Sequence, residues 1–159
     1  TQGNLAKALY VSDSLVSQWE TDRAPVPRHL ARKVVRLLPR PAVILEMAHQ
    51  LLGKAFVSPV LNRVDRHLAC MIGRTEEEFQ EVLERSAAVR KIVFSKTATD
   101  LTSEDRKILW DWSQDLVDGR TAVDNTLAVI CDKCSFDPEE LFSDHWAKLA
   151  AKGYYDPRG

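Results

Sequence analysis

Residues 1–23 read TQGNLAKALYVSDSLVSQWETDR, and their apolar side chains recur at helical spacing in two groups. The first group is Leu5, Ala6 and Leu9. In the second group, Val16 and Trp19 are three residues apart and so lie on one face of a helix. Ser12 precedes this second group, and its hydroxyl is suited to cap a new helix. The spacing therefore predicts two short helices joined by a tight turn, with Trp19 in the core.

The side of the second helix opposite Val16 carries short polar residues. These are Asp13, Ser14, Ser17 and Gln18. Short hydrogen-bonding side chains on an exposed helix can reach base edges in the major groove of DNA. The pattern therefore favours a DNA-reading helix over residues 12–22.

The motif T-Q-x-x-L-A from Thr1, followed by V-S-x-S-x-V-S-Q-W-E from Val11 and then by Arg23 and Pro25, resembles the helix-turn-helix of the Cro/CI/Xre repressor family. The resemblance covers residues 1–38 and includes a downstream helix over 27–38. It implies an all-α fold, with a lambda-repressor-like helix-turn-helix head joined to an α-helical bundle body. The first helix of the family motif would precede Thr1, so we expect an N-terminally incomplete head.

The resemblance implies a transcriptional regulator, a repressor of phage or prophage type, that binds a palindromic operator in double-stranded DNA as a homodimer. The residues expected to face base edges are Asp13, Ser14, Ser17 and Gln18. Gln18 is the leading candidate among them, because a carboxamide can bind adenine N6 and N7 together. The residues expected to contact phosphates are Gln2, Arg23, Arg28 and His29. Phosphate contacts supply salt-dependent affinity rather than sequence choice.

Three positions depart from the family pattern and keep a second interpretation open. Tyr10 stands where the family often has glycine, and a left-handed conformation there would cost about 1 kcal/mol. Asp22 replaces a second common glycine, and Asp13 places an acid among the base-facing positions. The alternative is a non-enzymatic protein-interaction module, antitoxin-like or a phage accessory protein, that keeps the helix-turn-helix as a scaffold.

Charge is unevenly distributed along the chain. Residues 1–40 hold seven basic and three acidic side chains, a net charge of +4, whereas the whole chain is at −1. Residues 41–159 therefore carry −5. A basic N-terminal part beside an acidic remainder is expected where one end of a protein meets phosphate.

Beyond residue 38 the sequence predicts a linker at 39–41, a helical dimerisation or partner-binding domain over 42–153, and a frayed tail at 154–159. Helix starts are indicated at Thr102 and at Asp137-Pro138, where a capping residue comes before the predicted first turn. Gly73 and Gly119 are expected to end helices, and Thr75 to cap the helix after Gly73. These boundaries predict a body of five or six helices.

The remaining composition favours a cytoplasmic, non-enzymatic protein without a cofactor. No apolar stretch approaches the length of a membrane span, and three cysteines are an odd number for a disulfide framework. Cys131 and Cys134 have the spacing of a zinc knuckle, with His145 as a third candidate ligand, but a second pair is missing. Structural thiols are therefore the preferred interpretation, and a metal site is a minor one.

Overall fold

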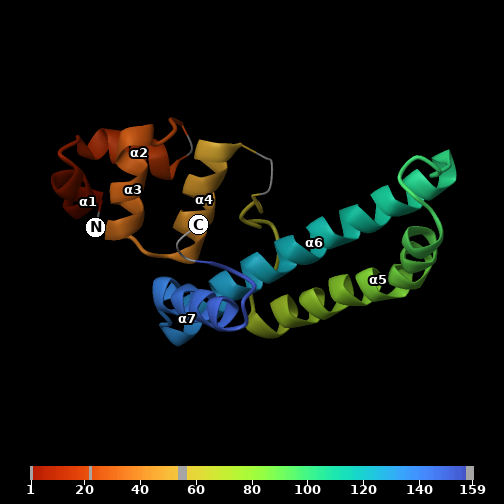
Figure 1. Ribbon diagram of the computed structural model, residues 1–159. Coiled ribbons are helices and arrows are strands. Elements are labelled where there is room, and N and C mark those ends of the chain that lie inside the picture. The colour runs from red at the N-terminus through yellow and green to blue at the C-terminus, as the bar shows by residue number, and fades with distance from the viewer. Residues whose placement is uncertain (1, 22, 54–56, 157–159) are drawn as a thin grey trace. The chain divides into compact units, whose positions relative to one another are not determined.

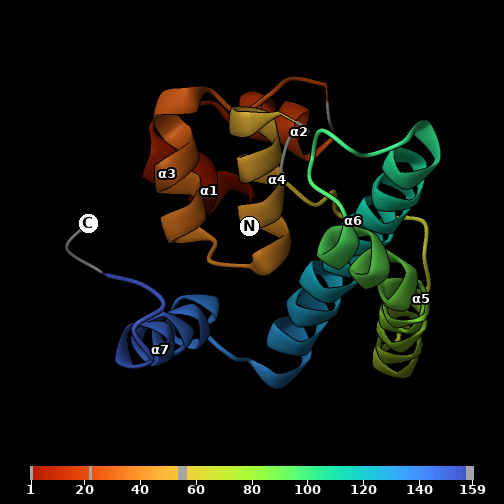
Figure 2. The ribbon, with the colours of Figure 1, turned by 45° about the vertical axis from the view of Figure 1, so that its right-hand side comes forward.

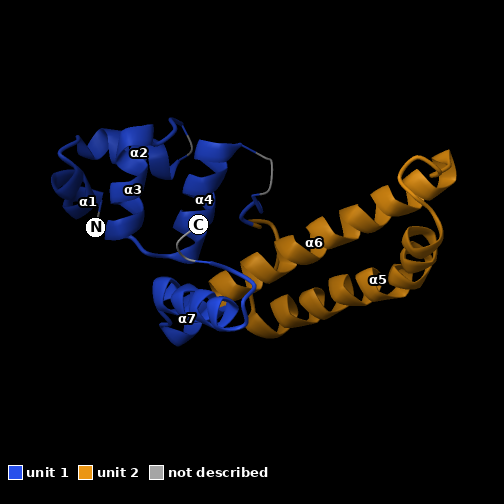
Figure 3. Cartoon of the chain, viewed as in Figure 1, with its two compact units in different colours: residues 1–60, 130–159 blue, residues 61–129 orange. Residues whose placement is uncertain are grey.

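The computed structural model describes residues 2–21, 23–53 and 57–156, which form seven α-helices and no strand (Figure 1). The chain divides into two units, residues 1–60 with 130–159 and residues 61–129 (Figure 3). Within the described ranges, no helix is both long and apolar enough to cross a membrane. The predicted all-α class is confirmed. Thr1 and Asp22, which entered the motif comparison, lie outside the described residues.

Two short helices open the first unit, α1 (Gln2–Leu9) and α2 (Asp13–Glu20). Ser12 caps α2 as predicted, since its hydroxyl accepts from the Leu15 N–H at 3.2 Å. Tyr10 lies in the turn between α1 and α2 and has a φ of 59°. This is the left-handed region, which glycine adopts at a lower conformational energy than tyrosine. The tight turn expected from the sequence is therefore formed at the cost of a strained tyrosine.

The helices α3 (Arg28–Leu37) and α4 (Pro41–Leu52) complete the packing of this N-terminal part. Its buried core joins Leu9, Ala31, Val34 and Met47, with Trp19 half-buried against them. Met47 belongs to α4, so the core extends beyond residue 38. Of the expected linker at 39–41, residues 39 and 40 belong to the short turn between α3 and α4, and Pro41 is the first residue of α4. The division between the units falls instead near residue 60.

The second unit is built from α5 (Leu68–Ser95) and α6 (Ser103–Cys134), which lie side by side and antiparallel (Figures 1 and 2). Residues 130–134 at the end of α6 belong to the first unit. Trp112 Nε1 donates to the Val82 carbonyl at 3.0 Å, and the hydroxyls of Thr75 and Thr126 lie 2.8 Å apart. The two contacts lie at different positions along the hairpin and together fix the register of α5 against α6.

The predicted helix ends at Gly73 and Gly119 are wrong, because α5 and α6 continue through them. Thr75 is not a cap either, since its hydroxyl donates to the Met71 carbonyl one turn back at 2.9 Å. A Cβ added at Gly119 would lie 3.9 Å from the Phe79 ring, an ordinary van der Waals distance, so Gly119 lies at the contact between α5 and α6 and not at a helix end. Only four helices, α4 to α7, therefore follow residue 40 in the described part of the chain, instead of five or six.

The start of α6 is confirmed near Thr102. The Thr102 N–H donates to Asp105 Oδ2 at 2.8 Å, and the Asp105 N–H donates back to the Thr102 hydroxyl at 3.2 Å, which is a capping box. Lys96 Nζ lies 2.5 Å from the same carboxylate. These contacts lower the pKa of Asp105 to about 2. The hydrogen bond from the Lys96 ammonium contributes most, and the hydrogen bonds from Thr102 contribute less.

The last helix, α7 (Pro138–Ala151), begins where predicted, with Asp137 accepting from the Glu139 N–H at 2.8 Å. Residues after its end are tied back to it. Gly153 has φ 72°, and the Tyr154 N–H donates to the Leu149 carbonyl at 3.0 Å, as in a Schellman motif. The Tyr155 ring packs edge-on against Trp146, with ring centroids 4.8 Å apart. The first residues of the predicted frayed tail are therefore ordered against α7.

Candidate nucleic-acid interface

Helix α2 turns one face to the core and the opposite face outward. Val16 is fully buried, whereas Ser14 and Gln18 are exposed and Ser17 is half-buried. Ser14, Ser17 and Gln18 are spaced by three and four residues and so share the outward face. Three of the four predicted base-facing residues are therefore brought together.

The fourth, Asp13, lies to the side of this face, next to α1. A Cβ added at Gly3 would be 3.7 Å from Asp13 Oδ2. Glu20, seven residues later on the same side of α2, accepts a hydrogen bond from Gln2 Nε2. Asp13 thus lies near the start of α1, and the Gln2 side chain is hydrogen-bonded to Glu20. Asp13 and Gln2 both remain exposed. These positions differ from the base-edge and phosphate contacts expected for them.

The other predicted phosphate contacts, Arg23, Arg28 and His29, are all exposed. Arg23 lies three residues after the last residue of α2, and its backbone N–H donates to the Gln18 carbonyl at 2.8 Å. Arg28 and His29 form the first turn of α3. Arg23 therefore flanks the C-terminal end of the α2 face, and the other two open the next helix.

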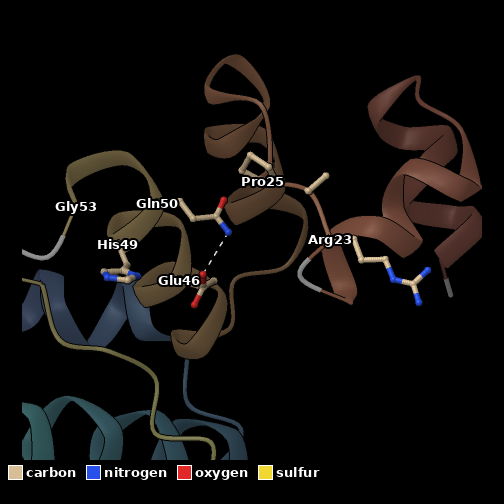
Figure 4. A pocket seen from close by; sticks show the side chains of 7 residues that line it. Arg23, Pro25, Glu46, His49, Gln50 and Gly53 are labelled. Carbon is tan, nitrogen blue, oxygen red and sulfur yellow. Dashed lines mark hydrogen bonds between the residues drawn. The ribbon is translucent and has the colours of Figure 1, made fainter.

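Gln50 of α4 holds the connection between α2 and α3 in place. Its Oε1 accepts from the Val26 N–H at 3.1 Å, and its Nε2 donates to Glu46 at 3.2 Å. Figure 4 shows this pair beside an open pocket, with the Arg23 side chain directed away from Glu46. The guanidinium of Arg23 is therefore turned to solvent and not drawn to the nearby carboxylate.

Helix α3 carries a basic face, of which the resemblance to the family identified only Arg28. Arg28, Arg32 and Arg36 follow one another at four-residue spacing and are exposed, as is Lys33. Like charges at this spacing destabilise a helix slightly, so their alignment has no structural benefit. Among the described residues, the salt bridges include none of these four cations. The four-residue spacing was the signal in the sequence that could have identified this face.

The Lys33 ammonium also ties this basic face to the turn before α2. Its Nζ lies 4.9 Å from the centre of the Tyr10 ring, which is itself almost fully exposed. Lys33 of α3 and the turn before α2 are therefore neighbours on the surface of the N-terminal part.

The candidate zinc ligands are not gathered. Cys131 is buried, while Cys134 and His145 are exposed. Across the described ranges, no group of three or more His, Cys, Asp or Glu side chains could hold a metal ion. Burial raises the pKa of the Cys131 thiol, which favours a protonated packing residue over a ligand.

No family model matches the chain, and neither a curated protein nor a solved structure is significantly similar to it.

Proposed function

We propose that this protein is a sequence-specific DNA-binding regulator, a repressor of the Cro/CI/Xre type, acting as a homodimer on a palindromic operator in the cytoplasm. Helix α2 would enter the major groove, with Ser14, Ser17 and Gln18 towards the base edges. The outward grouping of these three side chains on α2 is the observation that carries the proposal. Occlusion of promoter DNA by the bound dimer would then block transcription.

The charge of the N-terminal part supports this proposal. The Arg28–Arg32–Arg36 face of α3 and the solvent-directed Arg23 supply cations that no carboxylate of the described salt bridges neutralises. Cations of this kind release counterions from DNA and make binding strongly dependent on salt. The revised set of phosphate contacts is therefore Arg23, Arg28, His29, Arg32 and Arg36.

The test is selection from a random double-stranded DNA library at two salt concentrations, followed by affinity measurement on the enriched site. The variant Ser17→Ala/Gln18→Ala should lose about 1–3 kcal/mol of binding free energy on that site, the value of a lost base-edge pair. The matched control is Ser113→Ala/Gln114→Ala, which changes an adjacent serine and glutamine exposed on α6. The control should bind as the wild type does.

The cations are tested by salt dependence. Arg32→Ala should weaken binding to all sequences alike and reduce the slope of log affinity against log salt by about 1. Arg120→Ala on α6 is the control, because Arg120 pairs with Asp124 in the second unit and should leave the slope unchanged. Equal effects of the two substitutions would contradict the assignment of the α3 face.

The acidic side of α2 favours one competing function. Asp13 and Glu20 place two carboxylates beside the outward face, and carboxylates repel phosphates. A protein-interaction module, antitoxin-like or a phage accessory protein, would tolerate them more easily. Failure to enrich any DNA motif at low salt, with a correctly folded protein, would favour that function.

A further inference from the structure

Helix α5 exposes an apolar stripe that lies beside its contact with α6. Phe79 is 48% exposed and Leu83 is 64% exposed, and Ala87 continues the line. One edge of the Phe79 ring borders Gly119 of α6, whereas Val82 and Arg85 bind α6 directly. About half of Phe79 and most of Leu83 therefore remain exposed when the hairpin has formed.

The order of residues along this stripe is symmetric about Leu83. Phe79 lies four residues before it and Ala87 four residues after it, while Glu76 lies seven before and Arg90 seven after. Glu76 and Arg90 are exposed and take no part in the salt bridges formed by the described residues. Reversing the direction of the stripe thus exchanges a large side chain with a small one and an acid with a base.

We propose that this stripe binds a second copy of the chain, with the two α5 helices antiparallel and a two-fold axis at Leu83. In this arrangement Phe79 packs against Ala87 of the partner subunit, and Glu76 meets Arg90 of the partner subunit. Each pair occurs twice, as two-fold symmetry requires. A parallel pairing would instead set Glu76 against Glu76 of the partner subunit, so the charges select the antiparallel direction.

The distances along the helix suit this pairing. Seven residues of α-helix advance about 10 Å, so the charged pairs lie about two turns from the axis, at the edge of the contact. Helices in contact are 8–10 Å apart, with the exact spacing set by the side chains between them. A phenylalanine opposite an alanine fills that space without requiring two large side chains to meet. The leucines at the axis form the apolar centre, and the ion pairs form its rim.

The first test measures the molar mass of the full chain by sedimentation equilibrium over concentrations up to about 100 µM. The wild type should reach the mass of two chains, and Leu83→Glu should raise the dissociation constant at least about 100-fold, because it brings two like charges together at the axis. The matched control is Val117→Glu, which adds the same charge to α6 at a residue that is 56% exposed. It should leave the dissociation constant unchanged.

The second test reverses the charges. Glu76→Arg and Arg90→Glu should each raise the dissociation constant at least about tenfold, since each variant sets like charges together twice. An equimolar mixture of the two variants should form heterodimers, and the double variant Glu76→Arg/Arg90→Glu should recover the homodimer. These substitutions lie at exposed positions, so circular dichroism should show unchanged helix content.

Three results would overturn the proposal. They are a wild type that stays monomeric throughout, equal weakening by Leu83→Glu and Val117→Glu, and charge variants that do not rescue one another. This inference gives the dimer of the proposed function a specific surface, and its tests contain no DNA. Loss of the dimer and loss of operator binding can therefore be distinguished.

Discussion

Replacing Arg85 with methionine should destabilise the protein much more than replacing the residue it binds. Arg85 Nη1 lies 3.0 Å from Asp115 Oδ1, but the arginine side chain is 50% exposed and the aspartate side chain only 7%. The second oxygen of Asp115 is buried and has no hydrogen-bond partner among the residues that the structure describes. Arg85→Met therefore leaves an uncompensated carboxylate inside the hairpin.

The cost of this change can be estimated from burial. Removing one partner of a fully buried ion pair costs 3–5 kcal/mol, and the half-exposed arginine reduces the expected loss for Arg85→Met to about 2–3 kcal/mol. Asp115→Leu leaves a cation that can turn to water, so it should cost at most about 1 kcal/mol. The double variant Arg85→Met/Asp115→Leu should lie within about 1 kcal/mol of the wild type, because an apolar pair can replace a buried ion pair.

The assay is urea unfolding monitored by far-ultraviolet circular dichroism. The free energies of unfolding of the variants are compared if their m-values, the slopes of free energy against urea concentration, are equal. Together the four proteins form a double-mutant cycle, which isolates the coupling between the two side chains. A cost for Arg85→Met equal to or below that of Asp115→Leu would refute the reasoning from unequal burial.

Three further predictions concern helix boundaries. The pKa of Asp105 lies at about 2, below its ordinary value of 3.8, so its carboxylate stabilises the fold above about pH 4 and this contribution is lost as the pH falls through about 2. The melting temperature of Asp105→Asn should accordingly fall less than that of the wild type between these pH values, and an equal fall would contradict the assignment. Gly73→Ala and Gly119→Ala should each raise the free energy of unfolding in urea by about 0.5–1 kcal/mol, because both glycines lie inside helices with room for a methyl group; destabilisation would instead indicate helix ends. Gly153→Ala should lower the free energy of unfolding by about 1 kcal/mol, since φ is 72° at this position. It should also speed hydrogen exchange of the Tyr154 amide, and unchanged protection of that amide would count against the Schellman motif.

Much of the local structure could be predicted from the sequence because its causes are local. Ser12 and Asp137 cap the helices that follow them, and each side chain accepts from a backbone N–H only two or three residues away. The burial of Val16 follows from helical periodicity in the same way. None of these features needs a distant part of the chain.

The candidate site was predicted only in part. The outward positions of Ser14 and Gln18 follow from the same periodicity, but the position of Asp13 beside Gly3 depends on how α2 packs on α1. Gln2 is likewise engaged by Glu20, which is distant in the sequence. The family motif assigns a role to each residue position separately. It does not describe contacts between side chains of different helices.

The sequence by itself determined the helical class, the polar face of α2 and the helix starts at Ser12, Thr102 and Asp137, because capping and periodicity act within about one turn of the chain. Only the tertiary structure decided that α5 and α6 run through Gly73 and Gly119, since packing between the two helices outweighs the small helix propensity penalty of a glycine. It also decided that α4 belongs with the first three helices, because Met47 closes a core whose other members lie at least 13 residues earlier. Burial of apolar surface joins residues without regard to their separation along the chain, and a local pattern cannot express that.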